Sequence, residues 1–331
     1  MLTRQSLNIK KDTEDLGNKE AFMLKRTLTG AVILLITIGF VLLKQFNNLF
    51  FDAFALIVMC CSLYETINAY KKAGKKPHTA LLFLAPLFIY VGLLFSRRLY
   101  AGIDVRVIFG SIISLIIVAV IMLMAFLTLD IMLAAKSRKL SGEMPEEELV
   151  KIDAFSSSKV SMQILAYPIL PLSFFLLLNN LSYQLSFLGI ILTFAVAMMT
   201  DTFAYLFGRA WGKRKFIPEV SPKKTIAGVV GGFVGGVIGS ALVFVFFYFT
   251  PYFDILNNVD LFSAITAVAL IGILGSYITQ LGDLIASSLK RKVGIKDYAN
   301  IFPGHGGFMD RFDGQMFVAF LSFIVLVLFF V

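Results

Sequence analysis

The chain has 331 residues, of which 58% are hydrophobic and only 15% are charged, and its formal net charge at pH 7 is +9. Soluble globular domains carry roughly 25% charged residues, so this composition excludes an ordinary soluble protein and indicates an integral membrane protein. In such a protein an excess of lysine and arginine sets orientation and binds anionic headgroups, so no nucleic-acid partner is expected.

Nine apolar segments follow a polar tail, and each is long enough, or nearly so, to form a membrane-spanning helix of about 20 residues. The predicted fold class is therefore an all-α integral membrane protein with about nine transmembrane helices. The tail, residues 1–26, mixes acidic and basic side chains. The expected spans are 27–43, 49–64, 79–95, 104–129, 161–178, 184–207, 226–249, 260–286 and 315–331.

Lysine and arginine residues are distributed unevenly over the loops between these spans. If the N-terminus is cytoplasmic, all but four of the 30 lie on the cytoplasmic side, and the exceptions are Lys44, Arg97, Arg98 and Arg106. Basic loop residues favour the cytoplasmic side of a membrane. We therefore expect a cytoplasmic N-terminus, an external C-terminus, location in the cell (inner) membrane and an active site that faces the cytoplasm.

The chain divides by content into three parts. Residues 1–26 form the tail, and residues 27–160 are expected to be membrane scaffold, because their cytoplasmic loops carry no constellation of titratable groups. In residues 161–331, polar side chains enter the spans themselves. Ionisable residues inside membrane spans are costly to bury and are candidates for function, so we expect catalysis in this last part.

The sixth span and the loop after it combine a carboxylate with clustered basic residues. Small and polar residues recur at helical spacing in "AVAMMTDTFAYLFGRAWG", as in helix packing faces, but packing does not readily explain Asp201. In the loop, Pro222 and Thr225 are interpreted as helix-entry residues beside Lys223 and Lys224. Basic side chains next to free N–H groups predict a phosphate site, with anionic lipid as the alternative ligand.

Glycines recur every four residues in the seventh span, in the small-xxx-small pattern that lets helix backbones approach closely. We interpret them as packing positions. They do not form a Walker phosphate loop, which needs glycine, four residues and then Gly-Lys-Ser/Thr after a strand. The two rows are Gly228, Gly232 and Gly236, and Gly231, Gly235 and Gly239.

The eighth span carries a polar stripe that descends to its basic cytoplasmic end. Asp283 lies roughly two turns above that end, so it is either a functional carboxylate or a partner of Lys290 or Arg291. Further acids in the next segment favour the functional interpretation. The stripe consists of Ser276, Thr279, Gln280, Asp283, Ser287, Lys290 and Arg291.

The segment "HGGFMDRFDG" precedes the ninth span. Asp310 and Asp313 are three residues apart, so at the start of a helix both carboxylates lie on one side, where magnesium bound together with substrate phosphates would relieve their repulsion. Arg311 can bind a phosphate in a fork, and His305 can donate a proton or act as a hydrogen-bonding residue only. Together with the acids of spans six and eight, this set predicts metal-assisted phosphoryl or nucleotidyl transfer.

The run "SSLKRKVGIKDYANIFPGHGGFMDRFD" resembles the signature of the phosphatidate cytidylyltransferases, also called CDP-diacylglycerol synthases. The resemblance extends to "DTFAYLFGRAWGKRKF" and "SPKKTIAGVVGG", so it covers residues 200–313, whereas the first half is similar only in hydropathy. The matching positions in the run are Ser287, Lys290, Arg291, Lys296, Asp297, Ala299, Phe302, Pro303, His305, Gly306, Gly307, Asp310, Arg311 and Asp313.

The resemblance implies a homodimeric membrane enzyme that converts CTP and phosphatidic acid to CDP-diacylglycerol and pyrophosphate. It implies a Mg²⁺-dependent metal centre, thought to include K⁺ as well, with Asp283, Asp310 and Asp313 as its carboxylates. The expected catalytic residues are these three with Lys290, Arg311 and His305. The expected substrate-binding residues are Lys223, Lys224, Thr225, Ser287, Arg291, Lys296 and Asp201.

Three other activities share parts of this pattern. A CTP-dependent polyprenol or phytol kinase uses the same nucleotide donor but lacks the complete motif. A CDP-alcohol phosphatidyltransferase shares D-x-x-D-G, but the Ala-Arg and the further aspartates of its motif do not follow Gly314. A cation transporter would use intramembrane carboxylates as a path, whereas the acids here lie with phosphate-binding residues at the inner surface.

Overall fold

The computed structural model describes residues 28–99, 104–140, 156–250, 260–302 and 306–331. The predicted N-terminal tail therefore lies outside the described residues. The helices are a first helix at Leu28–Leu43, then α2 (Asn48–Lys72), α3 (Thr79–Leu99), α4 (Asp104–Leu140), α6 (Ser156–Ile164), the π-helix η1 (Leu165–Ile169), α7 (Leu170–Asn179), α8 (Tyr183–Trp211), α9 (Ile226–Tyr248), α10 (Leu261–Lys292), α11 (Met309–Phe312) and α12 (Gln315–Phe330).

The predicted fold class is confirmed, since every expected span falls on a helix. Seven helices of the described part are long and apolar enough to cross a membrane, and the first helix and α12 are shorter apolar helices. At a rise of 1.5 Å per residue, the 16 residues of α12 extend about 24 Å, so a full crossing needs flanking residues or a locally thinner bilayer. The orientation of the helices in a membrane stays a prediction.

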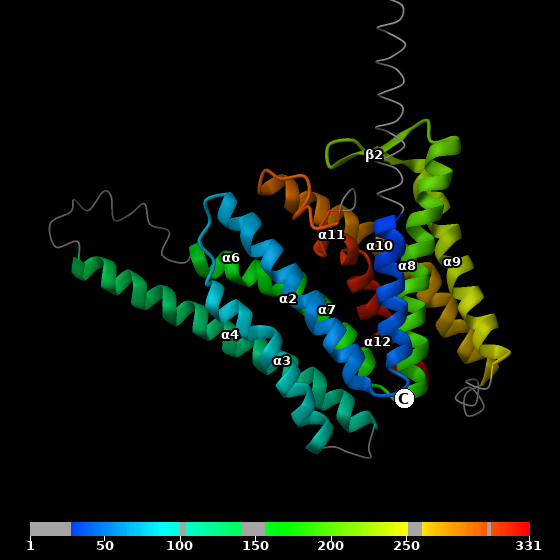
Figure 1. Cartoon of the computed structure of the whole chain (residues 1–331), viewed down its shortest axis with the longest axis horizontal. Coiled ribbons are helices and arrows are strands. Elements are labelled where there is room, and N and C mark those ends of the chain that lie inside the picture. The colour runs from blue at the N-terminus through cyan, green and yellow to red at the C-terminus, as the bar shows by residue number, and fades with distance from the viewer. Residues whose placement is uncertain (1–27, 100–103, 141–155, 251–259, 303–305) are drawn as a thin grey trace, which may run out of the picture.

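The helices form two flanks joined by α2, α7 and α12. Figure 1 shows α3 and α4 side by side on one flank and α8, α9 and α10 on the other. Helix α12 contacts α7, α8 and α10, and α2 contacts α3, α7 and α11. The segment that carries the predicted motif therefore lies where the two flanks meet.

Close approach between α8, α9 and α10 depends on the glycine rows of α9. A Cβ added at Gly235 would collide with the backbone carbonyl of Met199 in α8, and one added at Gly236 would collide with Ser276 in α10. Glycine therefore lets α9 pack against both neighbours at once. The interpretation of these glycines as packing positions is confirmed.

The loop between α8 and α9 folds into a short antiparallel hairpin, which the sequence analysis did not predict. Strand β1 (Lys215–Ile217) pairs with β2 (Ser221–Thr225). Pro222 lies in β2, so its interpretation as a helix-entry residue is wrong. Thr225 does cap α9, because its Oγ1 accepts a hydrogen bond from the backbone N–H of Gly228 at 3.1 Å.

Candidate active site

Three cavities meet beside Asp201 of α8, and this residue lines all of them. The central cavity has a volume of about 210 Å³ and lies between α8, α10 and the segment that leads into α12. The basic cavity, of about 440 Å³, lies between α8, β2, α9 and α10. The apolar groove, of about 680 Å³, runs along the first helix and α8.

The central cavity brings together the carboxylates that the sequence analysis placed on three separate segments. Carboxylates that lie close together repel one another unless a cation lies among them. The acidic wall that they form in this cavity therefore favours a bound cation or a cationic side chain. The expected carboxylates are Asp201, Asp283, Asp310 and Asp313, the structure adds Asp297, and the cationic side chains are Lys290 and Arg311.

Asp310 is the most extensively bonded of these carboxylates. Its Oδ1 accepts from Lys290 Nζ at 2.7 Å, and its Oδ2 accepts from the backbone N–H groups of Tyr298 and Gly307, each at 3.0 Å. Gly306 has a φ of +79°, and a Cβ there would collide with the Asp310 carboxylate. The first glycine of the pair is therefore required by the turn that Asp310 closes.

Arg311 and Asp313 have fewer partners than Asp310. Arg311 Nε is buried and has no hydrogen-bond partner within the described part of the chain, and its side chain lines both the central cavity and the apolar groove. Asp313 Oδ1 accepts from the N–H of Gly314 at 2.9 Å. Burial, with the nearby carboxylates of Asp283 and Asp201, raises the pKa of Asp313 well above its usual range. The negative charge of this carboxylate is therefore stable only when a cation or a proton neutralises it.

Asp283 bridges the central and basic cavities. Its Oδ2 lies 2.8 Å from Lys224 Nζ, which also donates to the backbone carbonyl of Gln280 at 3.1 Å. The alternative that Asp283 pairs with Lys290 or Arg291 of its own helix is therefore wrong. The pairing instead ties the hairpin strand β2 to α10 and places a lysine beside the acidic wall.

The basic cavity contains the residues of the predicted phosphate site. Lys223 and Lys224 of β2 line it together with Arg209 and Tyr205 of α8. Thr225, the cap of α9, also lines this cavity. The free N–H groups of a helix start and several cations together favour a phosphate-bearing ligand.

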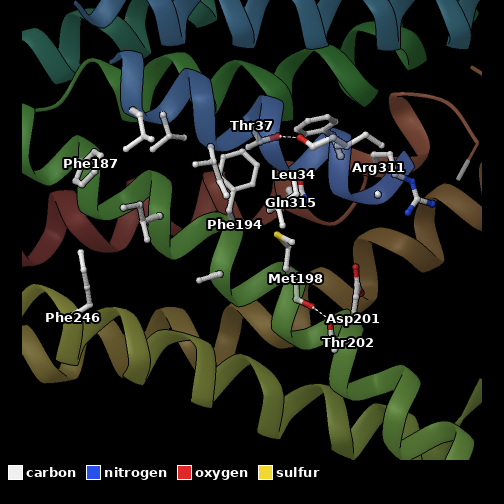
Figure 2. A pocket seen from close by; sticks show the side chains of 18 of the residues that line it. Leu34, Thr37, Phe187, Phe194, Met198, Asp201, Thr202, Phe246, Arg311 and Gln315 are labelled. Carbon is white, nitrogen blue, oxygen red and sulfur yellow. Dashed lines mark hydrogen bonds between the residues drawn. The ribbon is translucent and has the colours of Figure 1, made fainter. Parts of the chain in front are cut away.

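The apolar groove connects a hydrophobic end to the polar centre. Figure 2 shows Phe187 and Phe246 at one end, and Asp201, Thr202 and Arg311 toward the other. Between these ends most lining side chains are apolar, with Thr37, Gln45 and Gln315 as exceptions, and they come mainly from the first helix and α8. A groove with this gradient suits an amphipathic ligand.

Three predicted site residues are not part of these cavities, and a fourth lies outside the described residues. Ser287, Arg291 and Lys296 line none of the three, and Arg291 Nη1 instead donates to the carbonyl of Ile295 at the end of α10, at 3.0 Å. His305 lies outside the described residues. The roles of these four stay predictions.

Two residues were missed by the sequence analysis: Arg209, which lines the basic cavity, and Glu65, which lies in the part expected to be scaffold. Glu65 of α2 is only 2% exposed, and its two oxygens accept from the backbone N–H groups of Phe308 and Met309 at 2.8 and 2.9 Å. The part expected to be scaffold therefore contacts the motif directly. A glutamate inside an apolar helix was the available signal, but the expected span ended at residue 64, which placed Glu65 in a loop.

Among the described residues, no group of three or more His, Cys, Asp or Glu side chains is arranged to hold a metal ion. Magnesium commonly takes only one or two protein carboxylates and completes its shell with water and substrate phosphates. Asp283 and Asp313 fit this mode better than Asp310, because the oxygens of Asp310 already accept bonds from Lys290 and two backbone amides.

Comparison with known proteins extends these observations beyond the motif. A model described as the cytidylyltransferase family matches residues 24–329. The phosphatidate cytidylyltransferase of Staphylococcus saprophyticus subsp. saprophyticus is 41% identical over 138 residues, which are 42% of this chain and 48% of that protein. Proteins with the same description from Staphylococcus haemolyticus and Staphylococcus aureus are 42% and 39% identical over the same lengths. The chain thus spans about half the length of the curated relatives that it matches.

Proposed function

Because the chain belongs to the cytidylyltransferase family, we propose that it transfers the cytidylyl group of CTP to phosphatidic acid, giving CDP-diacylglycerol and pyrophosphate. The observation that carries this proposal is the meeting of three chemically different cavities at Asp201. A lipid, a nucleoside triphosphate and a reaction centre between them need an apolar, a basic and an acidic compartment that communicate.

The apolar groove suits an acyl chain of the lipid. Phe187 and Asp201 line its two ends and are 14 positions apart on α8, which corresponds to about 21 Å at 1.5 Å per residue. One leaflet of a 30 Å hydrocarbon core is about 15 Å deep, so the groove accommodates a full chain. The lipid phosphate would then lie beside Arg311, whose Nε is buried without a partner among the described residues.

The basic cavity suits the triphosphate of CTP. Lys223 and Arg209 are exposed and line the cavity on opposite elements, β2 and α8. Lys224 reaches from the same cavity to Asp283 at 2.8 Å, so a phosphate bound there is next to the acidic wall. The cations offset the repulsion between the triphosphate and the acidic residues.

A magnesium ion would be held by Asp283 and Asp313, with the remaining positions taken by water and phosphate oxygens. When bound, it would neutralise phosphate charge and stabilise the leaving pyrophosphate. A metal role for Asp310 and a second, potassium ion stay predictions. A homodimer and the cytoplasmic location of the site are likewise proposals, which follow from the family resemblance and the distribution of basic residues.

In the proposed reaction, a phosphate oxygen of phosphatidic acid attacks the α-phosphorus of CTP in line. A new P–O bond forms while the bond to the bridging oxygen of pyrophosphate breaks. The attacking phosphate is already ionised at neutral pH, so the protein needs to position and neutralise two anions and needs no general base. Arg311 and Lys224 do this from the groove side and the nucleotide side of the centre.

The test is to incubate the purified protein with phosphatidic acid, Mg²⁺ and CTP labelled on either the α- or the γ-phosphorus. We expect the α-label in a lipid product and the γ-label in pyrophosphate. Incorporation of the γ-label into lipid would identify a lipid kinase instead. No labelled lipid under any metal condition would contradict both activities and leave the transporter hypothesis.

A matched pair of variants tests whether the activity depends on the central cavity. Arg311→Gln is expected to remove most turnover because the lipid phosphate loses its cation. Lys72→Gln removes an exposed basic residue at the end of α2 and is expected to leave turnover unchanged. Equal activity of the two variants would contradict the role of Arg311.

A further inference from the structure

Glu65 is a buried carboxylate that meets backbone amides rather than a cation. Its side chain is 2% exposed, and no ion pair of Glu65 occurs within the described residues. Burying a carboxylate is costly unless its oxygens accept hydrogen bonds. Both oxygens do so, one from Phe308 N–H at 2.8 Å and one from Met309 N–H at 2.9 Å.

Three successive backbone N–H groups of the motif thus donate hydrogen bonds to two carboxylates from distant parts of the chain. Gly307 N–H donates to Asp310, and the next two N–H groups donate to Glu65. A Cβ at Gly307 would collide with both oxygens of Glu65, so the carboxylate lies directly on the glycine backbone. The second glycine of the motif is therefore a contact surface for α2, which Figure 1 shows passing close to α11.

This contact fixes the residues that face the centre. The amides bound by Glu65 immediately precede Asp310 and Arg311, whose side chains line the central cavity. A shift of the backbone at Phe308 and Met309 would move both side chains. Misplacement of reacting groups by about 1 Å costs roughly 100-fold in rate. A backbone that is held in place at this position therefore supports the reaction rate.

We propose that Glu65 is a positioning residue for the nucleotidyl transfer: it holds the backbone of residues 306–311 so that Asp310 and Arg311 face the substrates. The role in catalysis rests on the proposed function, whereas the mechanical role does not. Glu65 makes α2 part of the catalytic machinery, even though its side chain lines none of the three cavities.

The test compares the wild-type protein with Glu65→Gln, which has nearly the same shape but presents an NH₂ group to one of the two amide donors. The control is Thr66→Val, a buried neighbour whose Oγ1 donates only within α2, to the Ser62 carbonyl at 2.7 Å. Hydrogen–deuterium exchange is followed in peptides that cover residues 306–314 and α12. Initial rates are measured at varied CTP and phosphatidic acid concentrations.

In Glu65→Gln we expect exchange at least 10-fold faster in residues 307–312, unchanged exchange in α12, and a loss of at least 10-fold in kcat/KM for CTP. In an Arg311→Lys background the same substitution should cost less than 3-fold, because residues that act through one another are not additive. A general structural defect would instead cost the same in both backgrounds. Thr66→Val should leave all of these values within 2-fold of wild type.

Unchanged exchange in residues 307–312, or faster exchange with kcat/KM within 2-fold of wild type, overturns the proposal. Full additivity with Arg311→Lys overturns it as well. If Glu65→Gln does not fold, Glu65→Asp carries the same test, because it keeps the charge and withdraws it by one methylene. If the wild-type protein makes no CDP-diacylglycerol, the proposed function fails, while the exchange measurement still decides whether Glu65 holds the segment.

Discussion

The buried ion pair between Lys290 and Asp310 allows a quantitative prediction. Their charged atoms are 2.7 Å apart, and the side chains are only 10% and 4% exposed. Removing one partner of such a pair leaves an uncompensated buried charge, which costs about 3–5 kcal/mol. We therefore expect Lys290→Met to lower the free energy of unfolding by about 3–5 kcal/mol, near the lower limit, because Asp310 keeps its bonds from Tyr298 and Gly307.

Asp310→Asn is expected to cost a similar amount, since Lys290 is then left buried without its carboxylate. The double variant Lys290→Met/Asp310→Asn contains no buried charge at this position. Its loss should fall below the sum of the two single losses by roughly 1–3 kcal/mol, because coupled residues deviate from additivity. All three variants should lose turnover. The double variant should therefore recover part of the lost stability without recovering activity.

The assay is equilibrium unfolding of the four proteins in mixed micelles, followed by far-UV circular dichroism. Losses below about 1 kcal/mol in both single variants, the range of an exposed pair, would show that water reaches the pair. Simple additivity in the double variant would show that the two side chains do not interact. Either result refutes the assignment of Asp310 as a buried carboxylate that is stabilised by its ion pair with Lys290.

Three further predictions follow from the contacts of the site. Gly307→Ala should lower turnover at least 10-fold and speed exchange in the motif, because its methyl group collides with Glu65. Met198→Trp, which fills the apolar groove from an exposed position, should raise KM for phosphatidic acid about 10-fold and leave KM for CTP unchanged. Asp283→Asn should lower kcat at least 100-fold and raise the Mg²⁺ concentration for half-maximal activity, with the protein still folded.

Each of these three has a matched control elsewhere in the chain. Gly39→Ala places a methyl group where nothing lies within 4 Å, Val120→Trp adds bulk at an exposed position of α4, and Asp260→Asn changes the N-cap at the far end of α10. Turnover and KM should stay within 2-fold of wild type in all three. A site variant that behaves like its control contradicts the corresponding assignment.

The sequence was most informative where local rules decide the structure. Thr225 as a helix cap and the glycine rows of α9 follow from spacing alone. The acids of three segments were expected to converge because the predicted topology places each of them near the cytoplasmic surface. Asp283 was harder, because a helix-spacing argument offers only partners on the same helix, whereas the observed partner, Lys224, comes from a strand. Pro222 was misassigned for the same reason, since strand pairing in a short hairpin leaves little local signal.

Glu65 could not be placed from the sequence, because its partners are backbone amides. Every residue except proline carries a backbone N–H group, so no pattern of side chains in the sequence marks the contact between α2 and the motif. The length of a span is also poorly defined by hydropathy when a helix continues past the apolar region, as α2 does to Lys72. Contacts of this kind depend on how the two flanks pack, which is a property of the whole chain.

The hydrogen bonds from Phe308 and Met309 to Glu65 cross 243 and 244 residues of sequence, and this separation has a consequence for biosynthesis. Contacts between such distant residues form late and slowly, because the intervening chain must first be ordered. While a ribosome inserts the chain into the membrane, α2 is in place long before the motif has been translated. The carboxylate of Glu65 must then be accommodated by water, lipid headgroups or a proton until α11 arrives. Assembly of this contact therefore waits for α11, and translation arrested before α11 leaves the inserted helices without the hydrogen bonds between α2 and the motif.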